Sequence, residues 1–226
     1  MIFRIDKILQ DVRICLDENR IDETLLQTGD EDTLSLDEMI RSVVVEAVDR
    51  VHMAAPYYLL GQGHNLMDAL YDNEDNLVRR TPSVHWGTLE SGWIVLPDDF
   101  MRLVVFEMSD WERPVYAVIT PESPMFDRQR SRVKALRGTA QRPVCLLCVR
   151  PEGKVLEFYS CKSTNATVTR AVYMPHAMMD DRGGVDISER CYDAVVYTAA
   201  GLTLNRCKEA DKAAVLMELA KTYLQK

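Results

Sequence analysis

The spacing of apolar residues changes twice along this chain, and that change constrains the fold more than any other feature. Near the N-terminus apolar residues recur every three or four positions, which predicts an amphipathic helix over about 3–18. An acidic stretch at Asp30-Glu31-Asp32 predicts a loop. Ser35 and Glu38 have the spacing of a capping box, which predicts a second helix over about 36–53. Pro56 limits that helix, because the residue before a proline avoids the α conformation.

The middle of the chain has the pattern of strands. Between about 92 and 174, short segments rich in valine, isoleucine and aromatic residues alternate with turn-forming residues, which predicts an antiparallel sheet. Asp98-Asp99 marks a turn, and Glu152-Gly153 marks a hairpin. The segment from Cys145 to Val149 is apolar throughout, which favours a strand that is covered on both faces. The predicted strands are Trp93 to Leu96, Phe100 to Met108, Pro114 to Ile119, Pro143 to Val149, Val155 to Tyr159 and Val168 to Tyr173.

Helical spacing returns after Gly183-Gly184. Asp186 and Glu189 repeat the cap-and-N3 arrangement and predict a helix that continues to Leu202, and a further helix is expected from about Glu209. Each of these helices has one apolar face, so the N-terminal and C-terminal helices are expected to pack together. The predicted fold class is α+β, with these helices around a central antiparallel β region. We group 1–226 into one domain, helical over 1–62 and 186–226 and β-rich over 92–174.

A cationic run lies between two of the predicted strands, over 127–142. The chain as a whole carries a net charge of −8, yet every ionisable side chain from 128 to 142 is basic. Such a run attracts phosphate backbone, an acidic partner surface or the acidic face of a neighbouring copy; the alternative is a solvated loop. Because like charges repel, we expect an exposed or flexible arm that becomes ordered on assembly. The candidate contact residues are Arg128, Arg130, Arg132, Lys134, Arg137 and Arg142.

Composition limits the class of protein. Hydrophobic residues make up 47% of the chain, enough for a substantial core. The pI near 5.1 argues against a protein that coats nucleic acid with a whole basic face. The longest apolar segments fall short of the roughly 18 residues of a membrane span, and the N-terminus has charges where a signal peptide is apolar. We therefore expect synthesis and initial residence in a cytoplasm.

The residues that carry chemistry are scattered. Cys145 and Cys148 have no second pair at metal-ligand spacing, and positions three apart on a strand face opposite sides, so buried thiols without metal are expected. His176 lies among methionines, which favours a packing or interface patch over a metal site. No dinucleotide loop, Walker loop or nucleophile elbow occurs. The sequence therefore favours a protein that is not an enzyme and uses no cofactor. The tryptophans, expected as core or interface anchors, are Trp86, Trp93 and Trp111.

The order of these features resembles that of head–tail adaptor, or connector, proteins of tailed bacteriophages. The resemblance covers most of the chain and is carried by the order of four stretches more than by any one of them. They are Val51 to Pro56 after the helical pair, Val95 to Leu103, Arg137 to Val144 with Tyr173-Met174-Pro175 further on, and Tyr192 to Leu202.

The resemblance implies a structural virion protein of the phage neck, assembled in the host cytoplasm. Its copies would form a homo-oligomeric ring that joins the portal protein to the tail and neck proteins. The helices would form the ring wall and dock to the portal, and the β region would face the tail. The basic run would contact the portal, the next subunit or, without sequence specificity, the DNA that passes through the lumen; no membrane is implied. Two alternatives remain: a cytosolic α+β ligand-binding or enzymatic domain with its site near His85, Trp86 and Trp93, and a small nucleic-acid-binding module that uses only the run.

Overall fold

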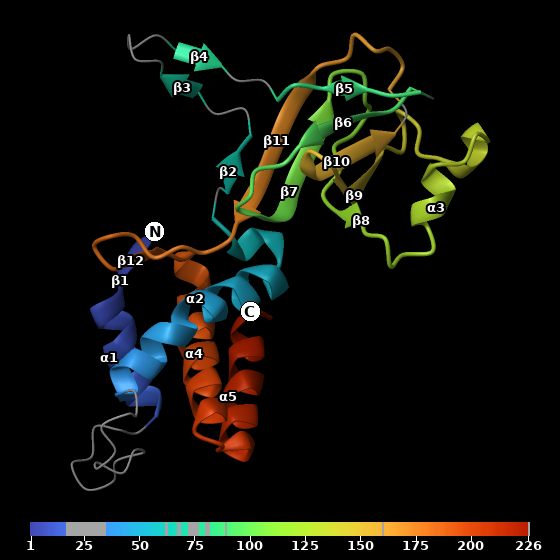
Figure 1. Ribbon diagram of the computed structural model, residues 1–226. Coiled ribbons are helices and arrows are strands. Elements are labelled where there is room, and N and C mark those ends of the chain that lie inside the picture. The colour runs from blue at the N-terminus through green and yellow to red at the C-terminus, as the bar shows by residue number, and fades with distance from the viewer. Residues whose placement is uncertain are drawn as a thin grey trace, which may run out of the picture. The chain divides into compact units, whose positions relative to one another are not determined.

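The chain folds into two compact units, which are described separately (Figure 1). The helical unit comprises Met1–Gln62 and His176–Lys226, and the β unit comprises Gly63–Pro175. The prediction of one domain over 1–226 stays a prediction, since a single domain can contain two such units. The predicted loop at Asp30-Glu31-Asp32 lies outside the described residues. The computed structural model describes residues 1–16, 35–61, 63–66, 69–71, 77–79, 82–88, 90–159 and 161–225.

The helical unit begins with a strand that the sequence did not predict. Strand β1 (Ile2–Arg4) pairs antiparallel with β12 (Gly184–Asp186), and helix α1 (Ile5–Cys15) follows directly. The N-terminal ammonium of Met1 lies 2.7 Å from Oδ1 of Asp186. The predicted helix start near residue 3 is therefore wrong by two residues, because the backbone of 2–4 pairs with a strand far along the chain.

The other helices follow the predicted spacing closely. Helix α2 (Leu36–Ala54) opens with the predicted capping box, in which Ser35 and Glu38 bond reciprocally, and a short 3-10 helix (Tyr57–Leu59) follows Pro56. Near the C-terminus, the 3-10 turn Glu189–Cys191 leads into α4 (Tyr192–Arg206) and α5 (Ala210–Tyr223). The predicted cap at Asp186 is wrong: α4 starts later, because Asp186 belongs to β12 and contacts the N-terminus.

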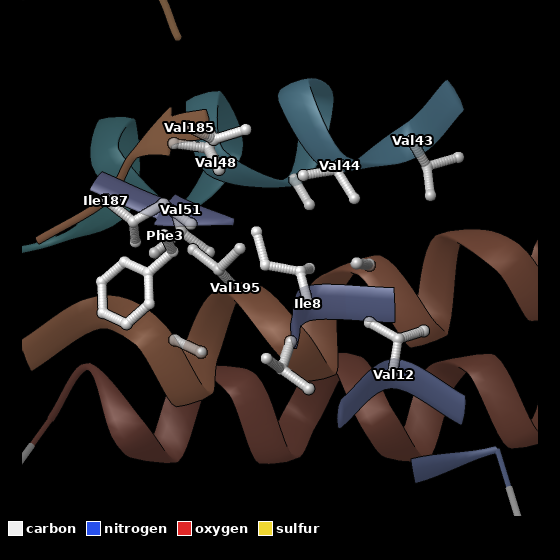
Figure 2. Packing of buried hydrophobic residues seen from close by; sticks show 14 of the residues in the cluster. Phe3, Ile8, Val12, Val43, Val44, Val48, Val51, Val185, Ile187 and Val195 are labelled. Atoms are coloured by element: carbon white, nitrogen blue, oxygen red, sulfur yellow. The ribbon is translucent and has the colours of Figure 1, made fainter. Parts of the chain in front are cut away.

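The N-terminal and C-terminal helices share one core, as predicted. Helix α4 contacts α1, α2 and α5, and Figure 2 shows side chains of α1 and α2 pointing toward α4. Ile8, Val44 and Val195, one from each helix, are completely buried. Burial of one such side chain contributes about 1.5–3 kcal/mol, so this shared core stabilises the association of the two ends of the chain. Within the described ranges, no helix has the length and apolarity needed to cross a membrane.

The β unit contains a five-stranded and a three-stranded sheet. The first has the order β5-β6-β10-β9-β8, the second has the order β2-β11-β7, and β3 pairs with β4 in a separate two-stranded sheet. Pairing is antiparallel except between β8 and β9, which run parallel, so the predicted antiparallel region contains one parallel pair. The bounds are β2 His64–Asn65, β3 Ala69–Tyr71, β4 Leu77–Arg79, β5 His85–Trp86, β6 Gly92–Val95, β7 Phe100–Met108, β8 Val118–Ile119, β9 Val144–Arg150, β10 Gly153–Tyr159 and β11 Val168–Pro175.

Both faces of β9 are covered from Cys145 to Cys148, as the apolar sequence predicted, whereas Val149 is 82% exposed. Cys145 belongs to the main core of the β unit, whereas Cys148 belongs to a smaller cluster on the opposite face with Phe126 and Tyr159. Gly153 makes the hairpin turn with φ of 120°, a conformation that other residues rarely adopt. Cys145 and Cys148 are buried free thiols on opposite faces, so the structure confirms the predicted burial.

Candidate interaction surface of the basic segment

The cationic run, called here the basic segment (127–142), connects β8 to β9. It forms the end of a one-turn helix, α3 (Phe126–Gln129), and a 3-10 turn (Lys134–Leu136), and it closes with a bridge between Thr139 and Arg142. The prediction of a loose, exposed arm is wrong for part of the segment. Arg137 is only 6% exposed, and Gln129 is only 2% exposed. The segment is an ordered loop that packs on the β unit.

Two side chains anchor the segment to the sheet. Phe126, at the start of α3, is buried against Leu146 and Cys148 of β9. Gln129 accepts a 2.7 Å hydrogen bond from the backbone N–H of Gly138 through its Oε1. Phe126 fills an apolar site on the outer face of β9, and Gln129 joins the two ends of the loop. These contacts position the basic residues between them.

Glu157 of β10 is the electrostatic centre beneath the segment. Its side chain is 9% exposed, and its Oε2 lies 3.4 Å from Nη2 of Arg130 and 3.1 Å from Nη2 of Arg150. The hydroxyl of Tyr159 donates a short hydrogen bond to Oε1. The guanidinium groups also stack on rings: Arg130 lies 4.8 Å from Phe126 and Arg150 lies 4.0 Å from the Trp93 ring centre. The buried carboxylate of Glu157 therefore has polar partners in Arg130, Arg150 and Tyr159.

The protonation of this cluster follows from its contacts. Burial would raise the pKa of Glu157, but the hydrogen bonds from Tyr159 and Arg150 and the charges of Arg130 and Arg150 outweigh it, so the pKa is lowered. Burial and the adjacent carboxylate raise the pKa of Tyr159. Burial and Glu157 also raise the pKa of Cys148, so this cysteine is a thiol and not an activated nucleophile. The cluster is a structural ion network around an ionised glutamate.

The remaining basic residues face outward. Lys134 Nζ pairs with Oε1 of Glu90 at 3.0 Å, and Nη1 of Arg128 lies 3.6 Å from Sδ of Met125. Arg132 and Arg142 are exposed, and neither side chain forms an ion pair or hydrogen bond within the described part of the chain. Of the six predicted contact residues, only Arg137 is buried. Arg130 and Lys134 are exposed but paired with Glu157 and Glu90. The side chains that are exposed and form no ion pair within the described residues are those of Arg128, Arg132 and Arg142.

Sequence reasoning missed the partners of Arg130. A usable signal is the alternation in β10, where Val155, Glu157 and Tyr159 lie on one face and all three are buried. A carboxylate in the middle of an inward-facing series requires a cation nearby. The nearest basic run in the sequence is the basic segment. The sequence could therefore have predicted that Glu157 pairs with a basic residue of this segment.

A hollow of about 350 Å³ borders the basic segment. Burial and Asp110 raise the pKa of Cys161 in its lining to about 12, so this thiol remains protonated near neutral pH. The two lysines that line it are in ion pairs, Lys134 with Glu90 and Lys162 with Glu112. The principal lining residues are Glu90, Lys134, Thr139, Cys161 and Lys162.

The other sequence candidates serve packing. His85 stacks on Trp93 with ring centres 5.4 Å apart, and Trp86 meets the ring of Phe158 edge-on. Trp111 packs against Phe158 in the core, which confirms its role as a core anchor. His85, Trp86 and Trp93 therefore all take part in ring packing, and a ligand site near them stays a prediction.

The remaining polar candidates form pairs. Asp99 accepts a hydrogen bond from Tyr173 in the predicted turn, and Nδ1 of His176 lies 2.8 Å from Oδ2 of Asp49. Among the described residues, no group of three or more histidine, cysteine, aspartate or glutamate side chains is placed to hold a metal ion. Neither a protein-family model nor a curated protein matches the chain.

Proposed function

We propose that this chain is a structural subunit of a ring that joins a phage portal to the tail. The observation that carries the proposal is the shared core of α1, α2 and α4, because the adaptor resemblance implies a helical wall built from both ends of the chain. The β unit is a continuous insertion between these ends, with its own core. This layout suits a subunit with one helical element for the portal and one β element for the tail.

The distribution of charge supports association of copies. Acidic residues outnumber basic ones in ranges 1–62 and 176–226, whereas the two are equal in number over 63–175, so the whole net charge of −8 belongs to the helical unit. The exposed arginines of the basic segment belong to the β unit. Different surfaces of opposite charge favour a head-to-tail contact, and such a contact closes into a ring when the rotation between copies permits it.

The test is the assembly of the full chain on the portal protein encoded by the same genome. The two proteins are mixed, and solution mass and electron microscopy are measured on each protein alone and on the mixture. We expect a ring of copies at one end of the portal. The control is an unrelated acidic α+β protein of similar size. Failure to bind the portal at any ratio of the two proteins would refute the proposed function.

The hollow beside the basic segment favours a second candidate, a domain that binds a small anionic ligand. Lys134 and Lys162 in its lining supply positive charge once their acidic partners are displaced. Inorganic phosphate is the simplest probe. A rise in Tm with phosphate that Lys162→Ala removes, together with no portal binding, would favour this candidate over the ring subunit.

A further inference from the structure

The helical unit carries a second hollow, of about 310 Å³, lined by residues of α1, α4 and α5. Its lining combines two carboxylates with three tyrosines. Asp11 comes from α1, and Asp193 comes from the first turn of α4. Ile14, which is 53% exposed, contributes an apolar part of the lining. The principal lining residues are Asp11, Ile14, Tyr192, Asp193, Tyr197 and Tyr223.

The rings of this hollow are held in place by their own contacts. The Tyr192 hydroxyl donates a 2.6 Å hydrogen bond to Oδ2 of Asp11, and the rings of Tyr197 and Tyr223 stack with centres 5.3 Å apart. Asp193 is exposed and forms no ion pair within the described residues. The hollow therefore presents one free carboxylate, one engaged carboxylate and fixed aromatic rings.

This set of groups suits a cationic side chain. A guanidinium group binds carboxylates through its N–H fork and stacks on aromatic faces, and a site that offers both favours arginine. One ring of this set already contacts a cation within the chain, because Nζ of Lys7 lies 5.0 Å from the centre of the Tyr192 ring. Burial raises the pKa of Cys15 in the same lining, and the charges of Asp11 and Asp193 raise it further, because both carboxylates act on this thiol.

A structural role explains only part of the hollow. An aspartate in the first turn of a helix stabilises the helix dipole, which accounts for Asp193. The hydrogen bond from Tyr192 accounts for Asp11, and the stacking of Tyr197 on Tyr223 accounts for those two rings. None of these contacts accounts for the exposed Ile14 beside the carboxylate of Asp193 in the same opening. These groups share one opening, so they are better explained together as a contact surface for a basic and partly apolar partner.

The chain itself offers that partner in the basic segment. Arg132 is exposed and makes no ion pair within the described residues, and its neighbour Val133 is 56% exposed. We propose that Arg132 of one copy enters the hollow between Asp11 and Asp193 of the next copy, with Val133 against Ile14. This inference rests on the proposed ring function and names the contact between its subunits. Donor and acceptor are different surfaces, so each copy provides both and the contact propagates from copy to copy.

The experiment uses two complementary charge reversals in the full chain, Arg132→Asp and Asp193→Arg. Self-association is measured by solution mass over a range of concentrations, with the chain alone and with the chain on the portal. Each variant alone should weaken self-association by about tenfold or more, because a like charge replaces an attractive one. Mixed together, the variants should associate more strongly than either variant alone. One variant keeps the intact hollow, the other keeps the intact arginine, and the two introduced charges are opposite in sign, so attractive contacts form between the variants.

Matched controls are Arg170→Asp in the β unit and Asp181→Arg in the helical unit. Both residues are exposed, and neither forms an ion pair within the described residues. These controls should associate as the unchanged chain does. Thermal unfolding of each variant checks that the fold is retained, and added salt should weaken association of the unchanged chain.

Three outcomes overturn the inference. The first is self-association of both reversal variants at the unchanged level, and the second is the absence of self-association of the unchanged chain both alone and on the portal. The third is a loss of DNA binding in Arg132→Asp with self-association unchanged, which would assign Arg132 to nucleic acid. Portal binding is scored separately: recovered association in the mixture of variants without portal binding would support this contact and refute the proposed function.

Discussion

The side chain of Gln129 accepts a hydrogen bond from the backbone N–H of Gly138 at 2.7 Å and is almost wholly buried. The bond joins residues nine positions apart and closes the basic segment into a loop. Gly138 itself lies against β9, where an added Cβ would approach the Val144 side chain to 3.0 Å. An uncharged hydrogen bond thus closes the segment, in addition to the ion pairs of Arg130 and Lys134, and Arg132 and Arg142 remain exposed.

Replacement of Gln129 tests this closure. Gln129→Ala leaves the Gly138 N–H without its acceptor, and we expect a loss of about 1–3 kcal/mol in the free energy of unfolding. Urea titration followed by circular dichroism measures it. Gln141→Ala, at an exposed glutamine of the same segment, is the control and should change stability by less than about 0.5 kcal/mol. Equal stability of the two variants would mean that the bond does not hold the loop.

The Glu157 cluster predicts a pH dependence. The pKa of Glu157 is lowered in the folded state. Its contribution to the free energy of unfolding is therefore fully present above the ordinary glutamate pKa, and it is lost as the pH falls through the lower pKa of the folded state. Glu157→Gln should lower stability at pH 7 by about 1–3 kcal/mol, since it removes a charged acceptor for two arginines. The difference in stability between Glu157→Gln and the unchanged chain should become smaller at acid pH. Denaturant midpoints between pH 7 and pH 3 measure both effects.

The control for that series is Glu152→Gln, at an exposed position in the β9–β10 turn. It should change neither the stability at pH 7 nor the acid response. A Glu157→Gln difference that stays constant from pH 7 to pH 3 would contradict the assignment of an ionised glutamate.

Separate replacement of Arg130 and Arg132 should distinguish a charge that stabilises the fold from one that is only exposed. Arg130→Ser removes a contact with Glu157 and the stacking on Phe126, and we expect a loss of about 1 kcal/mol, because its side chain is half exposed and Arg150 remains. Arg132→Ser should leave the thermal midpoint unchanged. Differential scanning calorimetry compares the two. An equal change in the thermal midpoint of the two variants would show that the ion pair between Arg130 and Glu157 does not stabilise the fold.

The capping box of α2 gives a local test in the helical unit. Ser35→Ala removes the acceptor for the Glu38 backbone N–H and should cost about 1 kcal/mol. Ser35→Asp preserves an acceptor at the same position and should retain most of the stability. Loss of stability in both variants would point to a role of Ser35 other than capping.

The cysteines predict an order of chemical modification. Burial raises the pKa of Cys145 well above its ordinary value, and that of Cys161 to about 12, whereas Cys207 is only half-buried. At pH 8 a maleimide should label Cys207 long before Cys145 or Cys161, because the thiolate is the reacting form. Mass spectrometry of digested samples measures the order. Rapid labelling of Cys145 in the folded protein would contradict its burial.

Much of the fold could be predicted because its signals are local. Ser35 and Glu38 are three residues apart and specify the start of α2 by themselves. Phe100–Met108 was predicted with its observed bounds, and the Glu152-Gly153 turn marked the β9–β10 hairpin. The failures involve distant partners: Ile2–Arg4 forms a strand only because Gly184–Asp186 lies beside it.

The sequence alone determined the helix and strand periods, the α+β class and the sign of the basic segment, since each depends on neighbouring residues. Only the tertiary structure decided which charges of that segment remain free. Arg130 is held by Glu157, 27 residues further along the chain, and Arg137 is buried, while Arg132 stays exposed. The reason is physical: periodicity records which face of an element is apolar, but a buried charge is located by a partner that the chain brings close only on folding.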